Sequence, residues 1–378
     1  MSTPSLSLGI EEEYLLIDPA TRDLVREPPK AFFQACADAL GDAFSNELLQ
    51  AQVEIGTPAC ADIDQARVEL ARLRRSVAEI AGSFGIGLVA ASTHPFASWR
   101  NQKRVEKARY DSLAADMQIA ARRLAICGMH IHCAIEDPDL RIDLMRQAAY
   151  FLPHMLALST SSPYWRGEDT GLKAYRPSVF RDLPRTGLPE QLTCWADWQN
   201  LIDLLERTEL CDDASKIWWD LRPSIKFPTL EMRVCDICTT MEDAIAIAAL
   251  FQALMAFLAR LHRENRSWRV YRPTLIAENM WRAQRYGVEG AYADFGAAAL
   301  KPFALLMQEM AAMLAEEAGR LGTIAELRHV GTIVERGTSA DRQRAVFAQA
   351  QADGADEHQA QHAVVDWLMA ETLVGTQA

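Results

Sequence analysis

Four short segments of the sequence alternate between apolar and polar residues, and this period of two restricts the fold more than any other feature. Side chains two positions apart share a face of a β-strand, so each segment presents one apolar face and one polar face. The segments are the strand-like runs 6–17, 50–57, 125–135 and 228–236. Each predicts a half-buried strand whose second face is free for chemistry.

The polar faces carry groups that bind metals or phosphates. In LGIEEEYLLI, Glu11 and Glu13 point one way, whereas Glu12 points the other way. Over all four segments the polar faces hold Glu11, Glu13, Glu54, His130, His132, Glu231 and Arg233. One such group alone is typical of a solvated edge strand or a structural histidine, but its recurrence in four strands favours a site. Clustered carboxylates repel one another unless cations lie among them, and oxygen ligands with an imidazole suit Mg²⁺ or Mn²⁺.

Segments with the apolar spacing of helices lie between and after these strands in the chain. They are 62–84, 142–158, 242–264, 301–320, 339–352 and 356–373. Strands and helices do not alternate regularly, which favours an α+β fold over a doubly wound α/β fold. No repeat or linker divides the chain, so 1–378 is predicted to be a single catalytic domain. The irregular stretches 159–194 and 265–290 are expected to be substrate-side loops.

Composition and targeting signals exclude several classes of protein. The net charge of -12, from 51 acidic and 39 basic residues, argues against a nucleic-acid partner. The N-terminus lacks the basic and apolar regions of a signal peptide, and the most apolar segment, 244–259, is shorter than the roughly 18 residues that a bilayer needs. We therefore expect a cytoplasmic protein without a membrane partner, whose eight cysteines are reduced.

Other catalytic motifs are weak. Cys235 and Cys238 form a lone C-x-x-C without a second pair, which does not favour zinc. The glycines at 82–87 follow a helix and lead into a strand, the reverse of a dinucleotide-binding loop. The sequence contains no P-loop, so any nucleotide would have to be held without one. It contains no G-x-S-x-G elbow, and none of its eight cysteines sits in a recognisable nucleophile motif, so covalent catalysis has no support.

Several separated motifs together resemble one family. They are GIEEEYLLID, QVEIGTP, CGMHIH, IWWDLRPS followed by TLEMRVCD, and GTSADRQRAVF. In order over about residues 8–350, they resemble the carboxylate–amine ligase group of the glutamate–cysteine ligase family, type 2, whose catalytic core resembles glutamine synthetase. The resemblance implies a curved, mainly antiparallel sheet of about six strands that forms an active-site funnel, with helices packed on its outer face.

The resemblance also implies roles for single residues. It gives the metal ligands as Glu11, Glu13, Glu54, His130 and Glu231. It gives the catalytic residues as Arg233 and Glu54, and the nucleotide-binding residues as Arg233, Arg222 and Arg336. It gives the substrate-binding residues as Arg176, Arg185 and His132. For the arginines other than Arg233, a purely structural role as surface or loop-tethering residues stays open.

The function implied is an ATP- and Mg²⁺-dependent ligase, with Mn²⁺ as the alternative metal. ATP would phosphorylate a carboxylate, and an amine would attack the acyl phosphate to form a γ-glutamyl amide. By resemblance the acid is L-glutamate and the amine is an amino acid such as L-cysteine, with a homodimer left open. A metal-dependent hydrolase and a catalytically silent ATP- or metabolite-binding protein are the alternatives, and no general base is identified.

Overall fold

The alternating segments form one antiparallel sheet in the computed structural model, which describes residues 3–377. Its strand order is β10-β11-β5-β1-β3-β2, and β4 pairs with the end of β1. The strands are β1 (Leu8–Ile17), β2 (Phe44–Asn46), β3 (Gln52–Gly56), β4 (Gly87–Val89), β5 (Met129–Ala134), β10 (Leu221–Pro223) and β11 (Thr229–Met232). The prediction of an α+β fold with a mainly antiparallel sheet of about six strands is confirmed.

The register of the sheet brings the polar side chains into rows. Glu11 of β1 lies opposite His130 of β5, and Glu13 lies opposite Glu54 of β3. On the other side of β5, His132 lies opposite Glu231 of β11. Because directly opposed residues of neighbouring strands point to the same face, the acids and imidazoles converge on one side of the sheet.

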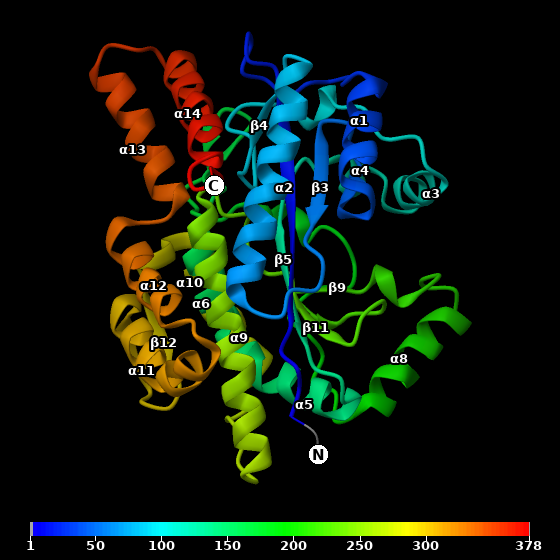
Figure 1. Ribbon diagram of the computed structural model, residues 1–378, viewed down its shortest axis with the longest axis vertical. Coiled ribbons are helices and arrows are strands. Elements are labelled where there is room, and N and C mark those ends of the chain that lie inside the picture. The colour runs from blue at the N-terminus through cyan, green and yellow to red at the C-terminus, as the bar shows by residue number, and fades with distance from the viewer. Residues whose placement is uncertain (1–2, 378) are drawn as a thin grey trace.

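Two long helices cover the other, apolar face (Figure 1). Helix α2 (Ile63–Ser83) begins at Asp62, whose carboxylate accepts a hydrogen bond from the amide of Gln65. Helix α9 (Met241–Arg263) is the one helix among residues 3–377 that is long and apolar enough to cross a membrane. However, 89% of its most apolar window is buried inside the fold, as in a core helix.

The apolar face also contains one buried ion pair. Glu12 and Arg74 of α2 are both fully buried, and the guanidinium donates to both carboxylate oxygens at 2.5 and 2.7 Å. Arg74 also donates to the carbonyls of Cys238 and Thr239, and the Tyr14 hydroxyl donates to Glu12. Every charge in this group therefore has a partner within the chain, as burial requires.

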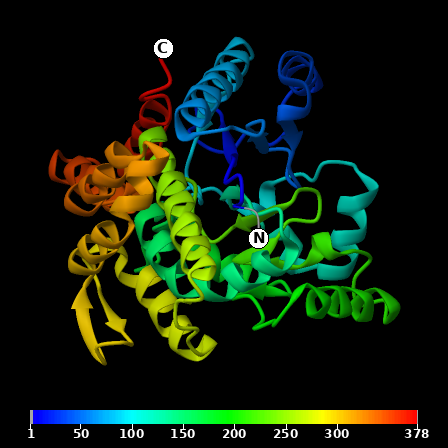
Figure 2. The same cartoon turned by 60° about the horizontal axis from the view of Figure 1, so that its bottom comes forward.

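The remaining helices flank the sheet, and the last four in the chain lie together at one side of the molecule (Figures 1 and 2). They are α1 (Lys30–Leu40), α3 (Ala108–Met117), α4 (Ile119–Arg122), α5 (Pro138–Ala148), α6 (Leu152–Ser159), α7 (Arg176–Phe180), α8 (Trp195–Arg207), α10 (Pro273–Tyr286), α11 (Phe303–Leu321), α12 (Ile324–Arg336), α13 (Ser339–Ala352) and α14 (Glu357–Thr372). Short two-stranded pairs join β6 (Tyr164–Trp165) to β7 (Glu168–Asp169), β8 (Thr186–Gly187) to β9 (Trp218–Trp219), and β12 (Ala291–Asp294) to β13 (Ala299–Pro302).

One predicted loop is wrong. The stretch 265–290 contains helix α10, which begins at Pro273 and buries Ile276, Met280 and Ala283 at helical spacing. Proline at the start of a helix loses no intrahelical hydrogen bond, and the apolar stripe packs on α6. The stretch 159–194 is closer to the prediction, because it contains only short elements, among them β6, β7, α7 and β8.

Candidate active site

The centre of the polar face is a pair formed by Glu11 and His130. The His130 Nδ1 atom lies 3.1 Å from a Glu11 oxygen, and the Nε2 atom of His132 lies 3.5 Å from the other. Burial alone would raise the pKa of Glu11, but the two imidazoles beside it outweigh burial and lower that pKa well below the usual value. Glu11 is therefore an ionised carboxylate between two histidines.

Glu231 is held by two arginines. Arg222 donates to both of its oxygens, at 3.0 and 3.2 Å, and Arg233 donates to one of them. Burial opposes ionisation, but Arg233 and Arg222 outweigh it and lower the pKa of Glu231 far below its ordinary value. Arg222 also donates to the carbonyls of Ser215 and Ile217, so its side chain holds Glu231 in place rather than reaching into open space.

Glu54 lies in a group of acids at the other end of the face. Its oxygen accepts a hydrogen bond from Ser45 at 3.0 Å, and Glu13 accepts one from the amide of Gly128 at 2.6 Å. Burial, followed by the charges of Glu47, Glu11 and Glu13, raises the pKa of Glu54 well above its usual value. Without a cation this end of the site carries excess negative charge.

Three sets of side chains place one ligand atom each within 4.8 Å of one another. The sets are Glu11, Glu54 and His130; Glu11, His132 and Glu231; and Glu13, Glu47 and Glu54. The Nε2 atoms of His130 and His132 are buried and have no hydrogen-bond partner among the described residues. Carboxylate oxygens with one imidazole fit hard divalent cations such as Mg²⁺ and Mn²⁺. The donor set therefore fits the predicted metals, and Glu47 is a candidate ligand that the sequence reasoning missed.

A pocket of about 420 Å³, open to solvent, lies beside this cluster. Glu13, Glu47, His130 and two buried guanidinium groups, those of Arg176 and Arg233, line it. The rest of its wall comes from Leu48, Gln52, Leu124, Ile126 and Phe180. Carboxylates thus lie next to guanidinium groups, an arrangement that suits a phosphate with a bound metal ion.

Arg176 reaches this pocket past a glycine. A Cβ atom at Gly128 would lie 2.3 Å from Nη2 of Arg176, so any other residue at position 128 would force the guanidinium to move from this place. The Nη atoms of Arg176 lie 3.4 Å from the carbonyl of Arg233, and its Nε atom is buried without a partner among the described residues. Arg176 is therefore held in place with donor capacity to spare.

Two predicted residues are not brought to the site. Arg185 donates to the carbonyls of Lys216 and Leu210, at 3.0 and 3.2 Å, which ties two loops together. Arg336, at the end of α12, pairs with Asp243 of α9 in the helical layer. These contacts match the loop-tethering alternative for both arginines rather than a contact with substrate or nucleotide.

The C-x-x-C pair also lies outside the site. Cys235 and Cys238 are buried and unbridged, and burial raises the pKa of both thiols, that of Cys235 to about 12. Thiols of this kind are poor nucleophiles and poor metal ligands, because both roles need the thiolate.

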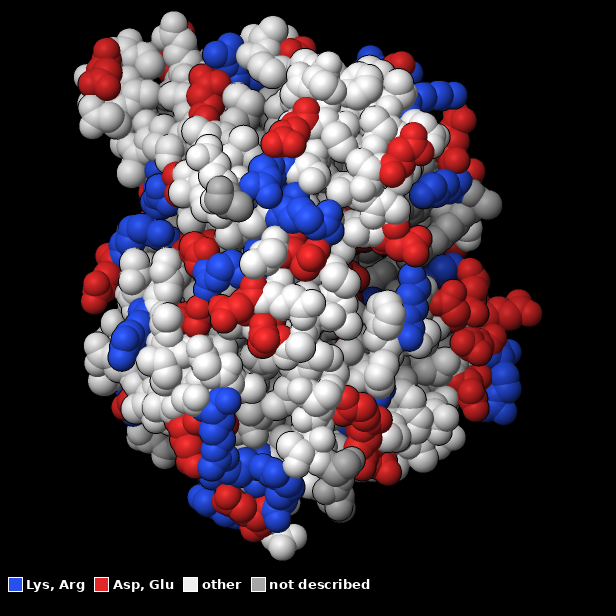
Figure 3. All heavy atoms as spheres, viewed as in Figure 1, with Lys and Arg blue, Asp and Glu red and all other residues white. Residues whose placement is uncertain are grey.

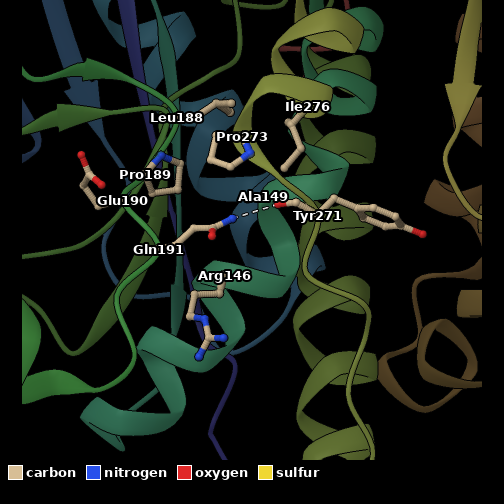
Figure 4. A pocket seen from close by; sticks show the side chains of 9 residues that line it. All are labelled: Arg146, Ala149, Leu188, Pro189, Glu190, Gln191, Tyr271, Pro273 and Ile276. Atoms are coloured by element: carbon tan, nitrogen blue, oxygen red, sulfur yellow. Dashed lines mark hydrogen bonds between the residues drawn. The ribbon is translucent and has the colours of Figure 1, made fainter.

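A second pocket, of about 270 Å³, lies where the segments 159–194 and 265–290 meet (Figure 4). Gln191 donates to the carbonyl of Tyr271 at 2.9 Å across it. Its walls are Arg146, Ala149, Leu188, Pro189, Glu190, Pro273 and Ile276. It holds none of the predicted site residues, and Glu190 is its only acid, so it is not the metal-binding centre.

Comparison with known proteins first defines the class. The fold matches a solved glutamate–cysteine ligase from Francisella tularensis in complex with AMP, with a TM-score of 0.67 and 12% identity over 99% of this chain and 90% of that one. It matches a bifunctional glutathione synthetase from Pasteurella multocida equally well, at 14% identity over 97% of this chain. The chain spans about half (52%) of that longer protein. The fold is thus that of the glutamine synthetase-like ligases.

Sequence similarity then gives the family. Residues 7–362 match the model of glutamate-cysteine ligase family 2 (GCS2), and the chain belongs to that family. A relative from Rhodospirillum rubrum, provisionally named glutamate–cysteine ligase 2, is 52% identical over 99% of this chain and 97% of its own length. The protein is therefore an enzyme of the ATP-dependent carbon–nitrogen ligase class, a carboxylate–amine ligase.

Proposed function

We propose that the protein joins the γ-carboxylate of L-glutamate to the amine of an amino acid, with L-cysteine as the first candidate, at the expense of ATP and with Mg²⁺ in the site. The observation that carries the proposal is the polar face of the sheet, where three sets of possible metal ligands lie beside an open pocket that two acids, one imidazole and two arginines line. The names of the relatives supply the candidate substrates.

The reaction needs an activated acid. A carboxylate is a poor electrophile, and an amine at neutral pH is protonated. Transfer of the γ-phosphoryl group of ATP to the acid gives an acyl phosphate, whose carbonyl carbon an amine can attack with release of phosphate. Such a transfer depends mainly on positioning and on neutralising the phosphate oxygens. The residues around the pocket serve these two purposes.

The acids and imidazoles of the sheet are the proposed metal ligands. Glu11, Glu13, Glu54, His130 and Glu231 would hold Mg²⁺ or Mn²⁺, with Glu47 as an added ligand and His132 beside Glu11. When bound, the metal supplies charge that neutralises the phosphates of ATP. The excess negative charge around Glu54 is relieved in the same step.

Arginines complete the phosphate site. Arg233 and Arg176 face the pocket from two elements, strand β11's end and helix α7, and can bind phosphate oxygens from two sides. Arg233 donates to Glu231 in this structure, so its guanidinium would be shared between that carboxylate and the phosphate. Arg222 fixes Glu231, and His132, held by Thr229 at 2.9 Å, lies at the substrate side of the face.

The test is nucleotide turnover. ADP release is expected only when Mg²⁺, an acid and an amine are all present, with an equimolar amide that mass spectrometry identifies. Hydrolysis of an amide or a phosphate ester in the absence of ATP would instead make the protein a metal-dependent hydrolase. Binding of Mg·ATP without any phosphate release, over a panel of amino acids and amines, would make it a silent binding protein.

A further inference from the structure

Asp220 is an acid on the polar face that belongs to none of the three sets of possible metal ligands. It lies between β9 and β10, and its carbonyl accepts a hydrogen bond from the amide of Arg233 at 2.9 Å. The next residue pair along the ladder is Leu221 with Met232, both fully buried on the apolar side. By strand alternation Asp220 therefore shares the polar face with Arg222 and Arg233.

The carboxylate of Asp220 lacks a hydrogen bond that its burial calls for. Its Oδ2 atom is buried and has no hydrogen-bond partner among the described residues, and the nearest cation, Nη2 of Arg181, is 3.8 Å away. Its side chain is 12% exposed. A buried acceptor without a donor is costly, so this position favours a ligand that brings N–H groups.

The charged groups around Asp220 indicate the chemical class of this ligand. Arg181, Arg176 and Arg233 are the charged groups that act on Asp220, and the last two line the pocket where phosphate is proposed to bind. A metal ion carries at least two positive charges and no N–H group, so the three guanidinium groups repel it strongly and it cannot supply the missing donor. A phosphate would be repelled by the carboxylate itself. An ammonium group carries a single charge and donates N–H groups to the acid, and an acyl phosphate bound beside it would offset its repulsion by the arginines.

We propose that Asp220 binds the ammonium group of the amine substrate and accepts its proton before the attack. This inference rests on the proposed ligase function. One proton moves from nitrogen to the Asp220 carboxylate, and the freed lone pair forms the C–N bond with the acyl carbon. The bond between the acyl carbon and the oxygen that bridges to phosphorus then breaks, and its electron pair leaves with the phosphate. The phosphate takes the second proton from nitrogen. Asp220 finally returns its proton to solvent.

The protonation of Asp220 agrees with this role. Burial raises the pKa of Asp220 above the ordinary value, although Arg181, Arg176 and Arg233 act in the opposite direction. A raised pKa makes a carboxylate a better proton acceptor. A phosphate bound between Arg176 and Arg233 would offset their charge and raise it further.

Hydroxylamine separates this role from a structural one. It is a much weaker base than an amino acid amine and is mostly unprotonated at neutral pH, so it attacks an acyl phosphate without help from a base. We expect Asp220→Asn to lower turnover with the amino acid amine by roughly 100-fold or more, while hydroxamate formation stays close to that of the wild type. The remaining amide synthesis should rise about tenfold per pH unit, as the free amine does.

Two controls make the outcome decisive. Asp212→Asn changes a neighbouring acid that is 73% exposed, and should leave both reactions unchanged. Asp220→Ala should show the same selective loss as Asp220→Asn. If both Asp220 variants lose the two reactions equally, or keep both, Asp220 is not the base. If the wild type itself forms neither amide nor hydroxamate, the ligase proposal fails instead.

Discussion

Three consecutive glutamates in β1 occupy two different environments. Glu12 faces the helices, where Arg74 neutralises it and the chain supplies every remaining hydrogen bond. Glu11 and Glu13 face the pocket, where their partners are imidazoles and one backbone amide. On the helical side the sequence encodes its own cation, whereas on the pocket side it leaves the charge for ligands to balance. The comparison predicts that acids of the first kind determine stability and that acids of the second kind determine activity.

Removal of the buried cation should have the largest effect. Arg74→Met leaves Glu12 as an uncompensated charge inside the core, and we expect the free energy of unfolding to fall by about 3–5 kcal/mol. Urea denaturation measures it. Arg74→Met combined with Glu12→Gln should recover much of the loss. A single-variant loss below about 1 kcal/mol would mean that the pair does not stabilise β1.

On the pocket side, Glu231→Gln should abolish most activity and leave the protein folded. It removes one charge from the proposed metal site without changing volume, and we expect amide formation to fall by about 10²–10³-fold. Steady-state ADP release at saturating Mg²⁺ measures it, with the exposed Glu168→Gln as the control. Wild-type turnover in the variant would make Glu231 a structural carboxylate.

Low pH should reduce the free energy of unfolding because one buried imidazole on the helical side must take up a proton. His154 of α6 is buried, and burial lowers its pKa to about 4. Between that value and the ordinary pKa near 6.5 the unfolded chain binds more protons, so stability is lost as the pH falls through this window. The loss of stability over this window is about 3 kcal/mol. His154→Phe should flatten the pH dependence of unfolding by that amount, and an unchanged slope would contradict the assignment.

Arg233→Lys tests whether the guanidinium meets phosphate. Lysine keeps the charge but loses the planar pair of donors, so turnover should fall about tenfold while ATP affinity changes little. If Arg233 serves only as the partner of Glu231, the variant should keep most of its activity and lose mainly melting temperature. Measurement of turnover, ATP affinity and melting temperature on the one variant distinguishes the two.

The smallest effect has the opposite sign to that of Arg74→Met. Glu54 is destabilised by burial and by Glu47, Glu11 and Glu13 when no cation is bound, because its pKa is raised. Glu54→Gln should therefore increase the free energy of unfolding by about 1 kcal/mol in chelator at neutral pH. The gain should disappear in excess Mg²⁺. A loss of stability in chelator would show that Glu54 needs no external cation.

Strand parity predicted the shared face of Glu11, Glu13, Glu54, His130 and Glu231, because the period of two is a local property. Strand parity could not predict site residues that lie outside regular strands. Glu47 directly follows β2, and Asp220 lies in the one-residue gap between β9 and β10, so neither has a periodic signal. The nucleotide role predicted for Arg336 depended on how α12 packs against α9, which no local pattern reports.

Strand β1 is central in the sheet but comes first in the chain. It pairs directly with β3, β4 and β5, and β5 begins more than 100 residues after β1 ends. At about 5–20 residues per second, a ribosome releases β1 roughly 5–20 s before β5. During that time an apolar strand with unpaired edges would be prone to aggregate. The run Glu11–Glu13 places three negative charges in it, so the two acids that later lie on the pocket side, together with Glu12, disfavour pairing of the nascent strand with other chains.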